Sequence, residues 1–162
     1  MDLKELYLVG MNFYAFMGTG TKIERDRIPK NYSRISLTES QIEKIKSVDK
    51  TIKFLVSGEP WCADFQLNAT VLKKFCELNS NFDMSIITKG RGEKYLKPIL
   101  GLEEFKVPVI LPLNENYEIC GEAFLERPKS IKHFIFEDIK MDYLKGKFLE
   151  KTIEELIENI CK

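Results

Sequence analysis

The residues with the clearest chemical potential lie in the stretch GEPWCADF, residues 58–65. Cys62 follows an apolar run and precedes a helical pattern, so its thiol is expected at the start of a helix, directly after a strand. A second cysteine three positions later would complete a Cys-X-X-Cys dithiol, but that position is Phe65. The sequence therefore raises the question of what a single thiol can do at this place.

A thiol in the first turn of a helix faces backbone N–H groups without partners and the positive end of the helix dipole. Both favour the thiolate, so we expect a depressed pKa for Cys62 and an enhanced reactivity. The thiolate would attack a disulfide and form a mixed disulfide. Asp64 is expected to cap the helix or to carry a proton, and its charge would oppose thiolate formation in part. The alternative is that Cys62 is an inert remnant on a binding scaffold.

The other three cysteines offer no local partner for Cys62. Cys76 lies 14 positions further along the same predicted helix, which is about 21 Å at ~1.5 Å per residue, whereas a disulfide needs Cα atoms within roughly 7 Å. We expect Cys76 to be a small core residue, and Cys120 and Cys161 to be redox-silent. Turnover at Cys62 would then need an external low-molecular-weight thiol such as glutathione, and no bound cofactor is expected.

Composition narrows the choice of partners. The chain has 162 residues, of which 44% are hydrophobic and 31% charged. Its 25 Lys and Arg balance 25 Asp and Glu, so the electrostatic argument for nucleic acid or an anionic membrane as partner is absent. No segment approaches the ~18 consecutive apolar residues of a membrane span, and the start, MDLKELYLVG, lacks the basic region of a signal peptide. We therefore expect a cytoplasmic protein whose thiols are kept reduced.

Two other features indicate sites only weakly. One cysteine without a nearby histidine does not form a zinc site, so no metal is expected. The sole histidine, His133, is expected on the surface. The stretch KGRGEK, residues 89–94, lacks the phosphate-loop pattern and is expected to be a solvated basic connection.

Helix and strand patterns place the motif in an α/β arrangement. Residues 51–57 form a compact apolar run that predicts a buried strand, and residues 62–78 predict a helix after it. Residues 82–88 predict a second strand, parallel to the first because a helix connects them. Residues 1–48 are expected to be a helical extension, in which residues 18–33 form a polar connection. A short helix after that connection is expected to start at Ser36 or Thr38.

The second half of the chain is expected to add a short helix around residues 93–97 and then a hairpin. Two runs, VPVILPL and YEICGEA, predict strands joined by Asn114-Glu115-Asn116. Pro112 removes a backbone donor from the first of these strands, so we expect the pairing to weaken or bulge there.

The tail predicts two helical stretches, residues 130–146 and 147–160, with Gly146 ending the first. We find no linker, so the chain is expected to form one domain over residues 1–162. Its parts would be the extension, a core at residues 51–145, and a C-terminal helix at residues 147–161.

The order of these elements, with Trp-Cys at the first strand-to-helix turn and Val-Pro opening the third strand, resembles the thioredoxin fold. GEPWCADF is similar to the EPWCxxC loop of thioredoxins, and FKVPVILPLNENYEICGEA resembles the segment that follows their cis-proline. GMNFYAF, LNATVLKKFCELN and ERPKSI extend the similarity along most of the chain, to a group of small bacterial thioredoxin-like proteins. The resemblance implies an α/β thioredoxin fold (β-α-β…β-β-α), a mixed central sheet flanked by helices, with a helical N-terminal extension and an extra C-terminal helix.

The resemblance transfers roles to few residues. Cys62 matches the nucleophilic cysteine, Trp61 the tryptophan before it, and Pro108 the cis-proline that faces the thiol. Phe65 departs from the family pattern at the resolving cysteine, and Val56 departs at the buried acid that assists proton transfer to that cysteine. The buried acid and the resolving cysteine are thus both missing. This is consistent, because the acid assists proton transfer to that cysteine.

These matches predict a substrate groove between Pro60-Trp61 and Val107-Pro108, where a cis bond would leave the backbone of Val107 free to pair with an extended peptide. The preferred function is monothiol thiol–disulfide exchange, or reduction of mixed disulfides, through Cys62. Its partners would be a disulfide-containing protein or a small-molecule mixed disulfide. The rival is a catalytically silent binding module that uses the same groove for a protein partner. A third possibility is a partner interface on the apolar stripe of the terminal helix.

Overall fold

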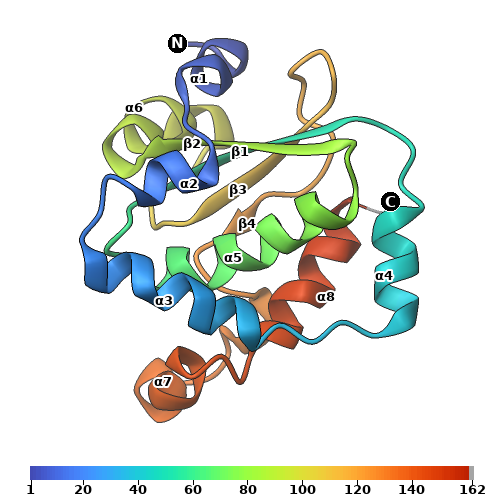
Figure 1. Cartoon of the computed structure of the whole chain (residues 1–162). Coiled ribbons are helices and arrows are strands. Elements are labelled where there is room, and N and C mark those ends of the chain that lie inside the picture. Colours follow the sequence, from blue (N-terminus) through green and yellow to red (C-terminus); the bar gives the residue numbers. More distant parts are fainter. Residues whose placement is uncertain (161–162) are drawn as a thin grey trace.

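The computed structural model describes residues 1–160, and its centre is a mixed sheet with the strand order β2-β1-β3-β4 (Figure 1). The strands are β1 (Ile52–Gly58), β2 (Phe82–Thr88), β3 (Val109–Leu113) and β4 (Phe124–Leu125). β1 pairs in parallel with β2, whereas β3 is antiparallel to β1 and β4 is antiparallel to β3. The predicted α/β thioredoxin-like fold is confirmed.

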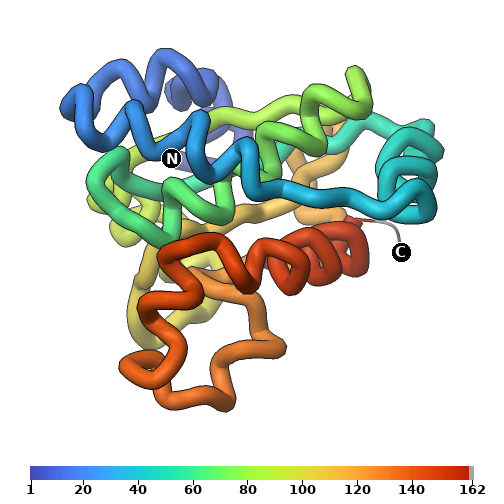
Figure 2. Tube along the Cα trace, turned by 60° about the horizontal axis from the view of Figure 1, so that its bottom comes forward, coloured from blue at the N-terminus to red at the C-terminus, as the bar shows by residue number. Residues whose placement is uncertain are grey.

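Helices cover both faces of this sheet. Within the described part of the chain they are α1 (Leu3–Val9), α2 (Phe13–Met17), α3 (Lys22–Ser33), α4 (Glu39–Lys46), α5 (Ala63–Leu78), α6 (Lys89–Leu100), α7 (Phe136–Leu144) and α8 (Leu149–Ile160), with a 3-10 turn η1 (Lys129–Ile131). In Figures 1 and 2, α3 runs alongside α5, and α8 lies beside the second half of α5.

The sheet separates two hydrophobic cores because successive strand residues point to opposite faces. Phe54 and Val56 of β1 lie in the core that α5 and α8 cover. Leu55, between them, lies in the second core, with Leu6 of α1 and Leu96 of α6. Burial on both faces explains why β1 is an apolar run without polar alternation.

The N-terminal extension contributes to the central structure. Residues 18–33, predicted as a polar connection, instead contain α3. The Thr21 hydroxyl accepts from the N–H of Glu24, whose carboxylate accepts from the N–H of Thr21, and this capping box starts the helix. Met11 forms a bridge with Ile86, so the extension also pairs with the edge strand β2. The short helix that follows begins after Thr38, one of the two predicted caps.

Two predictions about the connections are wrong. The basic stretch at residues 89–94, predicted as a solvated connection, instead opens α6, whose first turn the Thr88 hydroxyl caps. This helix of 12 residues includes and extends the short helix predicted around residues 93–97. The run YEICGEA pairs with β3 only through an isolated antiparallel bridge between Ile119 and Leu113, and does not form the predicted second strand. Asn114 Oδ1 accepts backbone N–H groups from Asn116 and Glu118 and holds a loop there, so β4 begins only at Phe124.

Pro112 does not disturb the sheet. The register between β1 and β3 continues through it without a bulge, so the prediction of weakened pairing is wrong. The Pro112 carbonyl accepts from the N–H of Cys120, on the side away from β1. Since the N and O atoms of one strand residue point to the same side, the missing donor faces away from β1 as well.

The C-terminal region contains η1 and α7 where one continuous helical stretch is predicted. Gly146, with φ of 80°, follows the cap residue of α7, as predicted for the end of that helix. The apolar stripe of α8, including Ile153 and Leu156, is buried in the core of this same chain, which leaves it unavailable as a partner interface. No helix among residues 1–160 has the length and apolar character that crossing a membrane requires.

Candidate functional site

Cys62 lies at the junction of β1 and α5, where it is the N-cap residue of the helix. Its partly buried thiol donates to the carbonyl oxygen of Val107, at an S···O distance of 3.8 Å. The peptide bond between Val107 and Pro108 is cis. The fold therefore places the sulfur, 45 residues away in sequence, beside the segment that opens β3.

The pKa of the Cys62 thiol is raised above its ordinary value of 9.0, chiefly because burial disfavours the thiolate. The backbone N–H groups of Phe65 and Asp64 act in the opposite direction, as the start of a helix should. The negative charges of Asp64 and Glu126 raise the pKa further. The prediction of a depressed pKa is therefore wrong, because desolvation and the two acids outweigh the helix terminus.

Phe65, at the position of the missing second cysteine, is a core residue with 0% of its surface exposed. Its ring packs edge-on against Phe16 of the extension, with 5.4 Å between centroids. A Cβ atom at Gly58 would lie 2.1 Å from Cδ2 of the Phe65 ring, so only glycine leaves space for the ring there. The aromatic ring thus replaces a resolving thiol with hydrophobic packing.

The two residues before Cys62 face different ways. Trp61 is 59% exposed and presents a large apolar surface beside the thiol. Pro60 is buried. A Cβ atom at Gly20, in the extension, would lie 2.8 Å from the Pro60 ring, and the Pro60 carbonyl accepts from Gln66 Nε2 at 2.7 Å. Of this pair, the side chain that lies at the surface next to Cys62 is that of Trp61.

Val107 and Pro108 contribute backbone atoms, since both side chains are buried. The Val107 carbonyl accepts from the Cys62 thiol, and the Pro108 carbonyl accepts from the N–H of Glu126 at 2.8 Å. The N–H of Val107 has no acceptor among residues 1–160. A backbone donor without a partner beside a sulfur is suited to an extended peptide, which would add its own carbonyl.

An ion pair close to the thiol was not predicted from the sequence. Both nitrogens Nε and Nη2 of Arg127 donate to the Asp64 carboxylate, at 2.9 and 3.2 Å, and Nη1 donates to Glu126. The guanidinium also lies 3.6 Å from the ring centre of Phe136. Asp64 therefore does not cap α5, because its carboxylate is taken by a fork-shaped donor from a segment 63 residues away.

A buried polar network continues from this ion pair into the protein. The Asn68 amide donates to the backbone carbonyl of Asp64 and to the Tyr143 hydroxyl, and its oxygen accepts from the Thr152 hydroxyl. Burial, and then the charge of Asp64, raise the pKa of Tyr143. The network joins α5 to α7 and α8, and it holds Asp64 in place. Asn68 is one of several polar residues in α5, so no signal in the sequence singled it out.

The other thiols lie apart from this site. Cys62, Cys76 and Cys120, the three cysteines in the described part of the chain, are all free. Cys76 lies near the far end of α5, where burial raises its pKa to about 12, and Cys120 is exposed after β3. Cys161 lies outside the described residues. Within residues 1–160 no group of three His, Cys, Asp or Glu side chains could hold a metal ion, and His133 is exposed.

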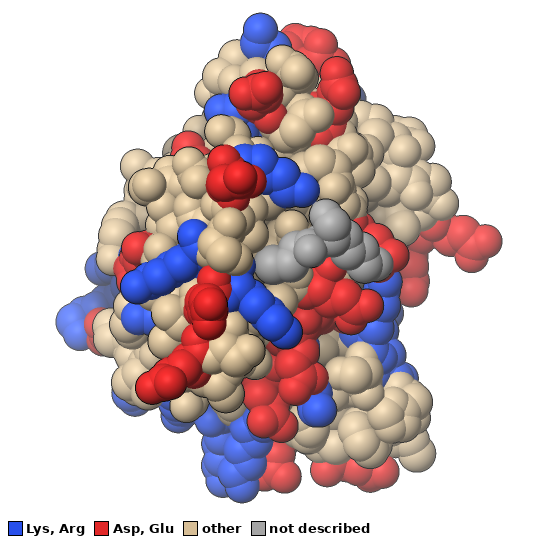
Figure 3. All heavy atoms as spheres, turned by 90° about the vertical axis from the view of Figure 1, so that its right-hand side faces the viewer, with Lys and Arg blue, Asp and Glu red and all other residues tan. Residues whose placement is uncertain are grey.

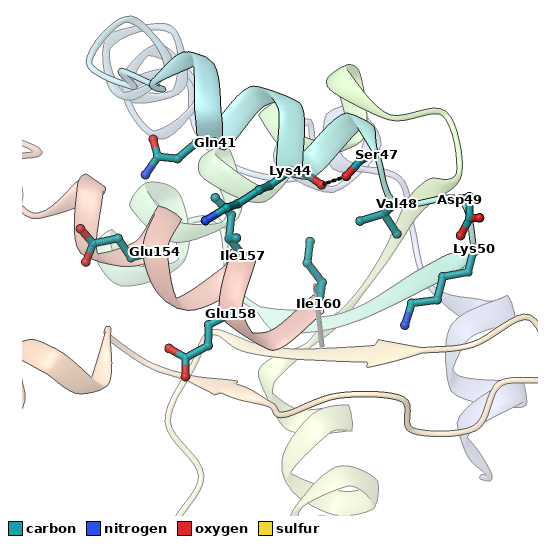
Figure 4. A pocket seen from close by; sticks show the side chains of 10 residues that line it. All are labelled: Gln41, Lys44, Ser47, Val48, Asp49, Lys50, Glu154, Ile157, Glu158 and Ile160. Carbon is teal, nitrogen blue, oxygen red and sulfur yellow. Dashed lines mark hydrogen bonds between the residues drawn. The ribbon is translucent and has the colours of Figure 1, made fainter.

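A cavity of about 770 Å³ lies elsewhere, between the end of α4 and the end of α8. Figure 4 shows Lys44 and Lys50 on one side and Glu154 and Glu158 on the other, above an apolar floor that includes Ile157. Figure 3, which faces the side where α4 lies, shows basic and acidic side chains interspersed over that surface. No residue of the Cys62 site lines this cavity, and its charges do not select one sign of ligand.

Comparisons with known proteins agree with the geometry. Two solved structures are similar over 98% of this chain and 96% of their own. One is an HIV epitope-scaffold, with 30% identity and a TM-score of 0.90. The other is a protein of unknown function from Pseudomonas aeruginosa, with 28% identity and a TM-score of 0.88. A comparison with curated proteins found no match.

A family model described as thioredoxin matches residues 10–142. This range includes Cys62, the cis bond before Pro108 and all four strands. The range also begins within the N-terminal extension, at the residue before the bridge that Met11 forms with β2. The chain therefore belongs to the thioredoxin family.

Proposed function

We propose that this protein carries out monothiol thiol–disulfide exchange through Cys62, with an external low-molecular-weight thiol completing the cycle. The observation that carries the proposal is the position of the Cys62 sulfur, 3.8 Å from the carbonyl of Val107, whose own N–H is without a partner. A substrate strand lying along Val107 would bring its disulfide next to this sulfur. Trp61 would cover the apolar side of that strand.

The exchange needs no second protein thiol. Cys62 loses its proton to solvent and attacks one sulfur of a disulfide R–S–S–R′. The new Cys62–S–S–R bond forms while the bond to R′ breaks, and R′–S⁻ leaves with the electron pair and takes a proton from water. The external thiolate then attacks the sulfur of R, which forms a new disulfide and releases Cys62. Overall the external thiol is oxidised, the R′ sulfur is reduced, and Cys62 is unchanged.

The raised pKa determines the conditions under which this chemistry is fast. Because only the thiolate attacks, the rate should increase about tenfold per pH unit until the pKa of Cys62 is reached. We place the protein in a reducing, cytoplasmic compartment, where such an external thiol is abundant. Its partners would be a disulfide-containing protein or a small mixed disulfide.

A second candidate, a binding module for extended peptides, is favoured by the same raised pKa. A thiol that stays protonated at neutral pH is a poor nucleophile, and the Val107 N–H and the Trp61 ring would bind a peptide without it. In this case Cys62 would only donate to the Val107 carbonyl.

One experiment separates the two candidates. A chromogenic aromatic disulfide is added to the protein and to the variant Cys62→Ser, and release of the coloured thiol is followed from pH 7 to 10, first alone and then with glutathione. The variant subtracts the reactions of the other cysteines, including exposed Cys120. Exchange predicts one equivalent released through Cys62 alone and repeated turnover with glutathione. A binding module predicts equal traces for both proteins.

A further inference from the structure

A second cavity, of about 320 Å³, lies between α3 and the first turns of α5. Ala63, the residue after Cys62, borders this cavity. The cavity itself lies on the face of α5 that is turned toward α3. Figures 1 and 2 both show α3 running alongside the start of α5, with α7 beyond it. The cavity is therefore formed by the N-terminal extension together with the thioredoxin core. Its volume falls near the lower end of the range for small-molecule sites.

The wall formed by α3 is basic. Arg27, Lys30 and Arg34 are spaced three and four residues apart, which places them on one face of the helix. None of the ion pairs among residues 1–160 includes any of these three side chains. Arg34 Nη1 donates to the carbonyl of Leu144 at 3.3 Å, which fixes it at the rim. No acidic residue lines the cavity, so its field attracts an anion.

A buried polar side chain also faces this cavity. Asn31 lies on the same face of α3, lines the cavity, and has only 6% of its surface exposed. Its side-chain amide forms no hydrogen bond with any other residue of the described chain, and its polar atoms are not among the solvent-excluded ones, so they are accessible from the cavity that the residue lines. A ligand oxygen in the cavity would accept from Asn31 Nδ2 in place of solvent. Gln66, the other amide in the wall, already donates its Nε2 to Pro60.

The remaining walls are apolar. Ala63 and Leu67 of α5 and Leu144 at the end of α7 face the basic residues across the cavity. A ligand that satisfies both sides carries an oxyanion at one end and a compact apolar group at the other. We infer that this cavity binds a small organic anion, with a carboxylate or phosphate held by Arg27, Lys30 and Asn31. The inference does not depend on exchange chemistry at Cys62.

Calorimetric titration with matched probes tests the inference. Phenyl phosphate and benzoate share the apolar ring and differ in the anion, benzyl alcohol keeps the ring without a charge, and inorganic phosphate keeps the charge without a ring. The structure predicts binding of phenyl phosphate or benzoate, weaker binding of inorganic phosphate, and no detectable binding of benzyl alcohol. If phenyl phosphate binds more tightly than benzoate, the ligand is a phosphate; if benzoate binds more tightly, it is a carboxylate. If neither binds, the inference is wrong.

Three variants locate the site. The double variant with Arg27→Gln and Lys30→Gln should weaken binding of the preferred anion by about tenfold or more, since two charge-assisted contacts are lost. Asn31→Asp places a carboxylate inside the cavity, so it should abolish binding and make the melting temperature insensitive to the anion. Arg91→Gln removes one exposed arginine from α6, remote from the cavity, and should leave the affinity unchanged.

The pattern of losses decides the outcome. Equal weakening in Arg91→Gln and in the Arg27 and Lys30 double variant would mean non-specific charge attraction, and would overturn the inference. Unchanged affinity in the double variant would overturn it as well, even if Asn31→Asp does not fold. Cys62→Ser should bind the anion with the same affinity as the parent protein. Anion binding therefore tests this cavity independently of whether Cys62 carries out thiol–disulfide exchange.

Discussion

Replacing Phe65 with cysteine restores the spacing of a dithiol, and the structure predicts that this change reduces stability before it adds chemistry. The Phe65 ring is fully buried against Phe16 and fills the space above Gly58. Truncation of such a ring to alanine costs about 3–5 kcal/mol. Phe65→Cys should cost somewhat less in its reduced form, because the thiol fills part of the space. Either loss is a large share of the ~5–15 kcal/mol that stabilises a typical domain.

Oxidation should return part of this loss. Residues 62 and 65 lie one turn apart at the start of α5, so their side chains are neighbours. A disulfide that closes such a short loop stabilises by about 2 kcal/mol in the chain-entropy description. Urea denaturation of Phe65→Cys with and without dithiothreitol measures this difference, and counting free thiols shows whether the bond has formed.

Phe65→Ala is the matched control for both effects. It should lose stability to a similar extent and be indifferent to dithiothreitol. If the stability of Phe65→Ala lies within about 0.5 kcal/mol of the parent, as for a surface substitution, the assignment of Phe65 to the core is refuted. If folded Phe65→Cys never forms the disulfide under oxidising conditions, the Cys62 sulfur does not face the first turn of α5.

Three further predictions concern the surroundings of the thiols. Gly58→Ala should destabilise the parent protein by about 1–3 kcal/mol through overpacking against the Phe65 ring. The same substitution should cost much less stability in a Phe65→Ala background. If Gly58→Ala costs the same in both backgrounds, residues 58 and 65 are not in contact. Asp64→Asn should speed alkylation of Cys62 at pH 8, because the Asp64 charge raises the Cys62 pKa, and an unchanged or slower rate would argue against this influence. The free energy of unfolding should fall as pH rises from 9.0 to about 12, because the unfolded chain ionises Cys76 in this window while the folded chain keeps it protonated. Urea titrations measure this free energy at each pH. If it has the same pH slope in Cys76→Ala as in the parent protein, Cys76 is not the cause.

The sheet and its main helix could be predicted from the sequence because local pattern determines them. β1 is a mostly apolar run, α5 has an apolar stripe, and a helix between two strands favours parallel pairing. The extension was harder to predict. α3 has a low apolar content and contains Pro29, so its sequence is typical of a loop, whereas its capping box and its packing on α5 make it a helix.

The thiol site was predicted in position but not in its electrostatics. Cys62, Trp61 and the Val107–Pro108 segment could be named because a short motif contains each of them. The depth of burial of the sulfur depends on the whole fold, and it reverses the expected direction of the pKa shift. Arg127 could not be linked to Asp64 from the sequence, since the two are brought together only when β4 returns beside β3.

The cavity between α3 and α5, for which we infer anion binding, was even harder to predict from the sequence, because it forms only in the tertiary structure. Arg27, Lys30 and Arg34 have the appearance of a solvated basic segment until α3 is placed against α5. Asn31 in the same stretch carries no sequence signal of burial. Only the packed arrangement shows that Asn31 is 6% exposed and lies in the wall of the cavity.

The most direct test of the central claim is the intact mass of the protein after incubation with oxidised glutathione at pH 9. Cys62, which has no local resolving thiol, should acquire one glutathione, which peptide analysis distinguishes from any adduct on the exposed Cys120, and should keep it until reduced glutathione is added. Cys62→Ser should lack that adduct. An unmodified Cys62 in the folded protein, or an adduct released without any added thiol, would contradict the account.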